Sequence, residues 1–286
     1  MIHLNGKEHD LGGGLTIHRI LPDRTKRMVG PFTFLDHMGP LTTAPDQNTD
    51  VRPHPHIGLS TLTYLYEGRI VHHDSLGTTA EITPGAVNWM TSGRGISHSE
   101  RAHVSEKGKA RRLHGLQFWI ALPDDLEDCE PDFQHYTKDQ IPTLETSDYK
   151  LSLVVGSAFG LQSPVNTTSP TIFADVVAKN DFDFNLKVPG FELAIYIIEG
   201  SARAGTNKIT KFQMLVFEKD AELDVKIDKG THFIIVGGEP FMTPRYMWWN
   251  LVSSSKEKIE VAKRAWGDRT FPQVPGETEY IPLPTS

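Results

Sequence analysis

Two short motifs in the N-terminal half of the chain carry side chains that could hold a metal ion. His54 and His56 stand on either side of Pro55, and His98 and Glu100 follow a glycine-rich turn. Residues two positions apart in an extended strand point to the same face, so each motif can direct two donors into one site. Three imidazoles and one carboxylate suit Fe(II), Mn(II), Ni(II), Cu(II) or Zn(II). The spacing therefore predicts one divalent metal with these four side chains as its ligands.

The alternative is a set of scattered surface histidines. The chain has 13 histidines, so a single His-x-His pair would not be unusual. Two pairs with the same spacing, in the same part of the chain, favour a metal site instead. Pro55 has no N–H to give to a strand ladder, which suits the entrance or edge of a strand.

Short apolar runs bounded by Gly, Pro, Asn and Asp recur along the chain and predict an all-β fold, a sandwich or a barrel. Part of the pattern is repeated. The segment YLYEG (64–68) reappears as YIIEG (196–200), and EITPGAVNWM (81–90) has a counterpart in KITKFQMLVF (208–217). We expect a duplicated β domain.

The two copies differ at the four candidate ligands. When the repeats are superimposed, the positions of the ligands are taken by Leu186, Val188, Val225 and Ile227 in the second copy. This exchange predicts a first barrel that holds a metal and a second barrel that is filled with aliphatic side chains and holds none.

One helix is expected near the C-terminus, at about 254–266. Ser254 would cap it, and Ile259, Ala262 and Trp266 would share its buried face. The tail behind it is too rich in proline for a regular element.

Bulk properties narrow the function classes. The 286 residues suggest two domains or one large β domain, and the net charge of −7 argues against direct nucleic-acid binding. No apolar run is long enough for a membrane span, and no secretory signal is recognised. Cys129 is the one cysteine, so no internal disulfide is expected and a reducing, cytoplasmic location is inferred. A duplicated barrel supplies its own interface, so we expect a monomer.

Three segments carry a family resemblance. HPHIGLSTLTYLYEG, TPGAVNWMTSGRGISHSE and LHGLQFWIALP resemble the signature segments of the pirin family of bicupins, and the part from WWNLVSSS to the C-terminus is similar to bacterial pirin-like proteins. The resemblance implies two tandem jelly-roll (cupin) barrels and a short C-terminal helix. We expect a metal-binding domain over 1–140 and a degenerate, metal-free domain with the helix and tail over 141–286.

The family also implies the metal. Its motif positions correspond to His54, His56, His98 and Glu100, which in pirins hold an iron-type ion, so Fe(II) is the expected cofactor. Ser60 stands where many pirins have glutamate, and Asn88 where other cupins have a histidine ligand, as pirins do. In pirins the glutamate of the later motif is the ligand, so neither position removes a ligand from the expected set.

A substrate pocket is expected near the metal. Phe34 and Met38 are candidates for its lining, with His37 near the barrel mouth, and Gln117 is a candidate inward-facing amide on the strand after the second motif. Other histidines receive structural interpretations. His72 and His73, beside Asp74, are expected in a solvent-facing turn, and His114 in a structural hydrogen bond.

The resemblance implies a quercetin 2,3-dioxygenase-type activity, in which a flavonol or a similar chelating substrate is cleaved by O₂ with release of CO. Glu100 could remain a ligand or accept the substrate's hydroxyl proton as general base. One alternative is a regulator without enzyme activity that binds a transcription factor or a metabolic enzyme according to the state of its metal. Another is a cupin isomerase or hydrolase that uses the metal only as a Lewis acid. No short motif identifies a protein partner.

Overall fold

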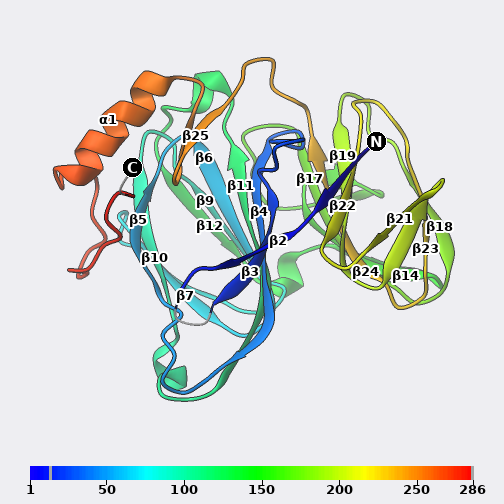
Figure 1. Ribbon diagram of the computed structural model, residues 1–286, viewed down its shortest axis with the longest axis horizontal. Helices are drawn as coiled ribbons and strands as arrows, with labels where there is room; N and C mark the ends of the chain where they lie inside the picture. The colour runs from blue at the N-terminus through cyan, green and yellow to red at the C-terminus, as the bar shows by residue number, and fades with distance from the viewer. Residues whose placement is uncertain (13–14, 285–286) are drawn as a thin grey trace. The chain divides into compact units, whose positions relative to one another are not determined.

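Short strands follow one another along almost the whole chain, as the apolar runs predict. The computed structural model describes residues 1–12 and 15–284. Its strands form two cupin barrels, each built mainly from one larger and one smaller antiparallel sheet (Figure 1). This confirms the all-β, two-barrel fold with one short α-helix. No helix in the described part of the chain is long and apolar enough to cross a membrane.

The candidate ligands lie in the unit made of Asp10–Ile17, Met38–His135 and Met242–Ser286, here called the histidine barrel. Its sheets have the strand orders β12-β9-β6-β11-β4-β3-β2 and β5-β10-β7-β8. The strands are β2 (Lys7–Asp10), β3 (Thr16–Leu21), β4 (Phe32–Thr43), β5 (Val51–His56), β6 (Leu59–Glu67), β7 (Ile70–Asp74), β8 (Thr79–Ile82), β9 (Val87–Thr91), β10 (Ile96–Arg101), β11 (Arg111–Ala121), β12 (Asp132–Tyr136), β25 (Tyr246–Trp248) and β26 (Leu251–Ser253). The chain passes between the two units within β2, β3 and β4.

The other unit consists of Met1–His9, His18–His37 and Tyr136–Phe241 and is called the apolar barrel. Its sheets have the orders β1-β22-β19-β24-β17-β14-β13 and β18-β23-β20-β21. The strands are β1 (Ile2–Asn5), β13 (Thr143–Glu145), β14 (Tyr149–Val155), β15 (Ser157–Ala158), β16 (Leu161–Gln162), β17 (Thr171–Ala178), β18 (Phe182–Leu186), β19 (Glu192–Glu199), β20 (Ser201–Ala204), β21 (Asn207–Thr210), β22 (Gln213–Phe217), β23 (Leu223–Ile227) and β24 (His232–Gly238). Short 3-10 helices lie at Val104–Glu106, Asp124–Leu126 and Lys138–Gln140.

The internal repeat corresponds to equivalent strands. YLYEG ends β6 and YIIEG ends β19, and both segments finish on a glycine with positive φ, Gly68 at 90° and Gly200 at 86°. The strand pair β5–β10 of the histidine barrel corresponds to β18–β23 of the apolar barrel. There, Val225 and Ile227 belong to a buried apolar cluster, and Leu186 and Val188 pack against it.

The helix and tail belong to the histidine barrel, which differs from the expected division into 1–140 and 141–286. Helix α1 (Lys256–Gly267) is capped by Ser255, whose side chain accepts a hydrogen bond from the backbone N–H of Lys258; Ser254 was expected as the cap. The reason for the division is packing. As predicted, the helix buries Ile259, Ala262 and Trp266, and they form one cluster with Ile57, Leu251 and Phe271, whose side chains lie in the same unit.

The tail runs along the outer side of β5 and β10. Figure 1 shows the tail and these two strands on the side of the barrel that carries α1. Ser97 donates to the carbonyl of Pro272, and both Ser99 and Arg101 bind the carboxylate of Glu277. The backbone N–H of Ile281 donates to the carbonyl of Pro53 at 2.8 Å. The strands that carry the candidate ligands are therefore held from outside by the last part of the chain.

Candidate metal centre

The two histidine motifs lie on neighbouring antiparallel strands. In the register of β5 and β10, His98 is directly opposite His54, and Ile96 is opposite His56. The tight turn before β10 requires glycine, because Gly93 has φ 49° and a Cβ there would lie 2.0 Å from the carbonyl oxygen of Cys129. Alternation then points the histidines inward and the intervening Ser97 outward to the tail.

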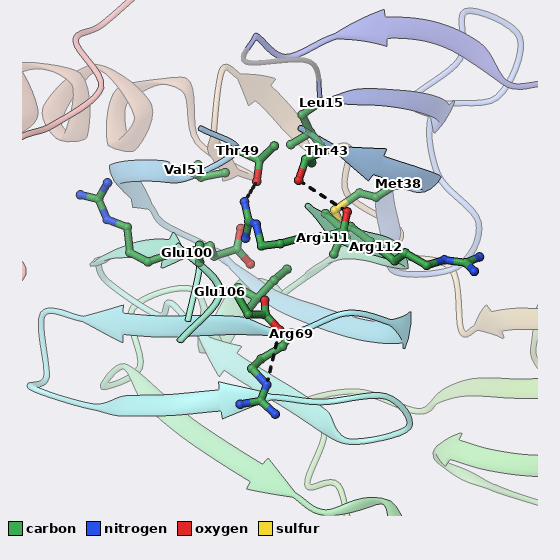
Figure 2. A pocket seen from close by; sticks show the side chains of 14 residues that line it. Leu15, Met38, Thr43, Thr49, Val51, Arg69, Glu100, Glu106, Arg111 and Arg112 are labelled. Atoms are coloured by element: carbon green, nitrogen blue, oxygen red, sulfur yellow. Dashed lines mark hydrogen bonds and ion pairs between the residues drawn. The ribbon is translucent and has the colours of Figure 1, made fainter. Parts of the chain in front are cut away.

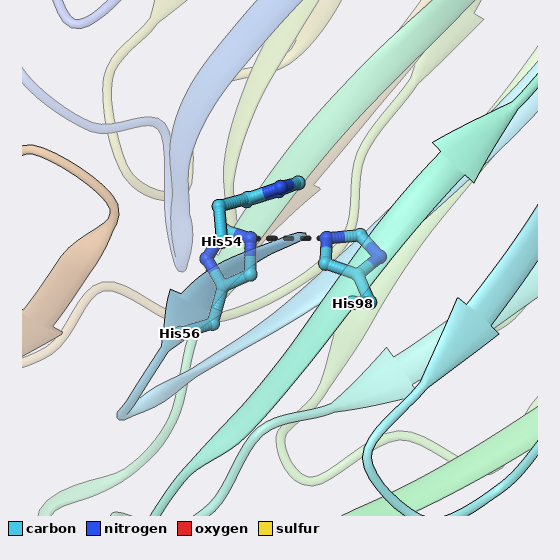
Figure 3. A group of neighbouring side chains, drawn as sticks. All are labelled: His54, His56 and His98. Carbon is cyan, nitrogen blue, oxygen red and sulfur yellow. Dashed lines mark hydrogen bonds between the residues drawn. The ribbon is translucent and has the colours of Figure 1, made fainter. Parts of the chain in front are cut away.

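His54, His56 and His98 come together as the spacing predicts (Figure 3). One donor atom from each lies within 4.8 Å of the others, and all three side chains are buried. The ring centroids of His54 and His98 are 4.4 Å apart, and those of His56 and His98 are 5.1 Å apart. In the described part of the chain, this is the one group of three or more potential metal donors.

Backbone carbonyls fix the tautomers of two of these rings. His54 Nδ1 lies 2.9 Å from the carbonyl oxygen of Arg52, and His56 Nδ1 lies 3.0 Å from that of Asn250. A carbonyl only accepts, so each Nδ1 carries the proton and each neutral ring keeps a lone pair on Nε2. Both rings are thus prepared to bind a cation through Nε2.

A carboxylate, Asp74, fixes the tautomer of the third ring, His98, through a further histidine, His72. His72 Nε2 lies 3.0 Å from Asp74 Oδ2, and His72 Nδ1 lies 3.2 Å from His98 Nδ1. Burial acts to raise the pKa of Asp74, but hydrogen bonds from His72, Thr78 and Leu76 outweigh it and lower the pKa. The ionised carboxylate accepts a hydrogen bond from His72 Nε2–H, so His72 Nδ1 carries a lone pair and accepts a hydrogen bond from His98 Nδ1–H. The lone pair of His98 is consequently left on Nε2, toward the other rings.

The resulting arrangement fits a metal ion. The Nε2 atoms of His56 and His98 are 3.2 Å apart, and both carry lone pairs, so they need a cation between them. Two nitrogens bound at right angles at about 2.1 Å from one ion would be about 3 Å apart. A proton is a poor substitute, since burial and the neighbouring histidines hold the pKa of His98 well below 6.5 and burial lowers that of His54 to about 4. Three neutral imidazoles therefore face one another in an arrangement that could hold a divalent ion.

Glu100 lies outside the group formed by the three histidines. The register of β5 and β10 shifts between His98 and Glu100, so that Glu100 is opposite Val51 and not the residue expected from regular pairing. Its carboxylate instead lies 3.3 Å from the hydroxyl of Thr63. Burial raises the pKa of Glu100, whereas His72 and the Thr63 hydrogen bond act in the opposite direction. Such a carboxyl group is suited to proton transfer beside a metal.

A narrow pocket leads to Glu100 (Figure 2). It is lined by Leu15 and Met38 together with Arg69, Arg111 and other polar side chains, and its volume is about 30 Å³. Met38, one of the expected substrate-pocket residues, lines this cavity, and its role in substrate binding stays a prediction.

The other expected pocket residues differ in place. Gln117 is half-buried and lies on the other side of Thr63 from Glu100. Its Oε1 accepts a hydrogen bond from the Thr63 hydroxyl at 2.8 Å. Phe34 is in the apolar barrel, with the Arg19 guanidinium 4.5 Å from its ring centroid. His37 is also in that barrel, fully buried, and its Nδ1 is 2.7 Å from the hydroxyl of Tyr196. The chain passes from the apolar barrel into the histidine barrel between His37 and Met38, within β4, so these neighbours in sequence belong to different units.

Sequence reasoning also missed the partners of the ligands. His72 was expected in a solvent-facing turn, but it is 3% exposed on β7, and its ring stacks on Phe133 at 4.6 Å between centroids. A usable signal was present, since His72 and Asp74 have the same two-residue spacing as the ligand pairs. Asn250 had no such signal, because a long separation in sequence precedes its contact with His56.

Comparisons with known proteins find relatives along almost the whole chain. A family model described as Pirin matches residues 14–120, and one described as Pirin C-terminal cupin domain matches residues 173–272. A pirin-like protein from Caulobacter vibrioides is 42% identical over 286 residues, covering 98% of this chain and 98% of that protein.

Two solved structures extend the comparison. A quercetin 2,3-dioxygenase from Acinetobacter baumannii has a TM-score of 0.91 and 34% identity, covering 100% of this chain and 95% of that chain. The bacterial pirin YhhW from Escherichia coli, in complex with nickel(II), shares the fold with a TM-score of 0.66 and 17% identity, covering 84% of this chain and 100% of that chain. With both family models matched and a relative similar along almost its entire length, the chain belongs to the pirin family.

Proposed function

We propose that this protein is a metal-dependent dioxygenase of the quercetinase type, which cleaves a flavonol or a similar chelating compound with O₂. The observation that carries the proposal is the set of three buried imidazoles with Nε2 lone pairs directed at one point, next to a carboxyl group with a raised pKa. The similarity to the Acinetobacter quercetin 2,3-dioxygenase supports the same reaction class.

His54, His56 and His98 would hold the metal, with Glu100 as the proposed fourth ligand or as a base beside it. A divalent ion bound there supplies Lewis acidity and, if it is iron as we propose, redox chemistry with O₂. Rotation of the Glu100 side chain toward the histidines would be required for ligation, since its carboxylate now pairs with Thr63.

The chain's own residues would prepare the substrate. Glu100 accepts the proton of the substrate's hydroxyl group at a carboxylate oxygen, and its raised pKa makes it a stronger base for that transfer. The Thr63 hydroxyl lies 3.3 Å from this carboxylate on one side. The ring of Trp119 packs against His56 in a T-shaped arrangement, with 5.3 Å between the ring centroids.

The size of the pocket limits the substrate. A cavity of about 30 Å³ accommodates little more than a water molecule, whereas sites for drug-sized ligands measure about 300–1,000 Å³. The residues that line this cavity include Glu100 but none of the three histidines, so on this proposal a flavonol reaches the metal only if the surrounding segments move apart.

The proposed function is tested by O₂ uptake. Protein reconstituted anaerobically with Fe(II) is mixed with quercetin, and the His98→Ala variant, with its metal content measured, serves as the control. We expect uptake in proportion to bound metal and none in the variant. No uptake from protein with a full complement of iron would refute the quercetinase proposal.

The small cavity also favours a second candidate, a regulator that binds a protein partner according to the state of its metal. On this proposal no substrate enters, and affinity for the partner changes between metal-loaded and metal-depleted protein. Partner capture from a lysate in both states, followed by binding measurements on the purified partner, separates it from the enzyme.

A further inference from the structure

A row of polar side chains crosses the inner face of the larger sheet of the histidine barrel. Gln117 on β11 is directly opposite Thr63 on β6, and Thr63 is directly opposite Asn88 on β9. Residues opposite one another in an antiparallel sheet point to the same face. Thr63 reaches Glu100 on β10, which belongs to the smaller sheet, so this face is the one turned toward the interior between the two sheets.

One member of this row has an unused hydrogen-bonding atom. Asn88 is 3% exposed, and its Oδ1 accepts a hydrogen bond from His135 Nδ1 at 2.6 Å. Its Nδ2 is buried and has no hydrogen-bond partner within residues 1–12 and 15–284. Turning the amide over exchanges the two atoms and still leaves one of them unpaired. A buried polar atom without a partner lowers the free energy of unfolding, so its presence calls for an explanation. A bound ligand that accepts a hydrogen bond from Nδ2 would supply one.

Glu100 offers the complementary group on the other side of Thr63. The hydroxyl of Thr63 has one proton, and Gln117 Oε1 at 2.8 Å is a closer acceptor than Glu100 Oε1 at 3.3 Å. The carboxylate of Glu100 therefore remains available to a hydroxyl group of a ligand. One donor and one acceptor, both beside Thr63, match a carbonyl group next to a hydroxyl group.

We propose that Asn88 is a substrate-binding residue, whose Nδ2 donates to the carbonyl oxygen of a cyclic hydroxy-ketone while Glu100 accepts from the adjacent hydroxyl group. This inference rests on the proposed function for the position of the metal, and it adds the residue that reads the carbonyl oxygen.

Binding without turnover tests this role. Zinc-loaded protein is titrated calorimetrically with maltol, a one-ring hydroxy-ketone, and with 4-pyranone, which lacks the hydroxyl group. Asn88→Leu removes the donor and keeps the size of the side chain, and Asn88→Asp keeps the acceptor for His135. Thr168→Val is the matched control, because Thr168 Oγ1 is also buried without a hydrogen-bond partner in the described part of the chain but lies in the apolar barrel.

We expect both Asn88 variants to bind maltol at least tenfold more weakly than the unaltered protein, with zinc content unchanged, and Thr168→Val to bind normally. Asn88→Leu removes the unpaired Nδ2 but also the acceptor of His135, so its melting temperature is compared with that of Asn88→Asp, which keeps that acceptor. Unaltered affinity in both Asn88 variants, a lowered melting temperature without loss of binding, or no maltol binding by the unaltered protein would each overturn the inference.

The two proposals fail separately. Loss of maltol binding in the Asn88 variants, together with no O₂ uptake on quercetin, supports the binding role and removes the quercetinase reaction. Normal O₂ uptake by Asn88→Leu would support the quercetinase reaction and remove the binding role of Asn88, because the reaction would then proceed without the carbonyl contact.

Discussion

Replacing Asp74 by asparagine should invert the tautomer of His98, to which Asp74 is linked through His72. The Oδ1 atom of Asp74 accepts from the backbone N–H groups of Leu76 and Thr78, and asparagine keeps that oxygen, so the turn is preserved. At the other position an NH₂ group replaces the acceptor and donates to His72 Nε2. His72 then carries its proton on Nδ1 and donates it to His98 Nδ1, which leaves the proton of His98 on Nε2, where the metal should bind.

The size of the effect follows from this change. Loss of an outer hydrogen-bond partner of a metal-bound histidine typically weakens metal affinity by about 10- to 100-fold. At about 1.4 kcal/mol for each factor of ten, the Asp74→Asn variant should lose roughly 1.4–2.8 kcal/mol of metal-binding free energy. His54 and His56 take their tautomers from backbone carbonyls and should remain competent, so binding is weakened and not abolished.

Competition against a chromophoric chelator at pH 7.5, with zinc or nickel, measures this loss, and ¹⁵N NMR of the imidazole nitrogens reports the tautomer of His98. Asp175→Asn is the matched control, because Asp175 Oδ1 also pairs with a histidine, His232, at 2.8 Å, but in the apolar barrel. Equal metal affinity in the Asp74→Asn variant and the unaltered protein, or equal losses in both variants, would refute the role assigned to Asp74.

Three further predictions concern stability. Burial lowers the pKa of His54 to about 4 from 6.5, so between these pH values the unfolded chain binds a proton that the folded protein does not. The metal-depleted protein should therefore lose about 3 kcal/mol of its free energy of unfolding as the pH falls across that range. In His54→Gln, the free energy of unfolding measured with urea should depend less on pH. Glu277→Ala removes the acceptor of Ser99 and one of the carboxylates that bind Arg101, which keeps Glu279 at 3.0 Å. It should lower the free energy of unfolding by about 1.5–3 kcal/mol and speed cleavage of the tail by a protease; unchanged cleavage would contradict the contact. Ile195→Ala opens a cavity in the apolar barrel and should cost about 2–5 kcal/mol in thermal or chemical unfolding, with metal affinity unchanged as its internal control.

Sequence patterns were most informative where strand geometry alone decides the outcome. A spacing of two residues is sufficient to put His54 and His56 on one face, and regular pairing then brings His98 opposite them. The same reasoning placed Glu100 with the histidines, but it assumes an unbroken ladder, and the shift in register after His98 is a local irregularity that no residue type announces. The four aliphatic counterparts in the second repeat were also informative, because burial of a whole strand face depends on pattern more than on detail.

Contacts between distant segments were not accessible in this way. His72 was assigned to a turn since two adjacent histidines and an aspartate are polar, and only Phe133 and His98 explain why that side chain is buried. The helix was expected from its periodicity, but its attachment to the histidine barrel depends on Ile57 and Leu251, which no periodicity reveals.

The attachment of the tail to the outer side of β5 and β10 couples the C-terminal part of the chain to metal occupancy. The same two strands carry ligands on one face and tail contacts on the other, and thermodynamic coupling between two binding events is reciprocal. If a bound ion adds order to these strands, it also strengthens the binding of the tail, residues 272–281, to them. A bound tail then raises the affinity for the ion by the same factor. If a bound ion does add order to these strands, the rate at which a protease removes the tail should fall as metal occupancy rises.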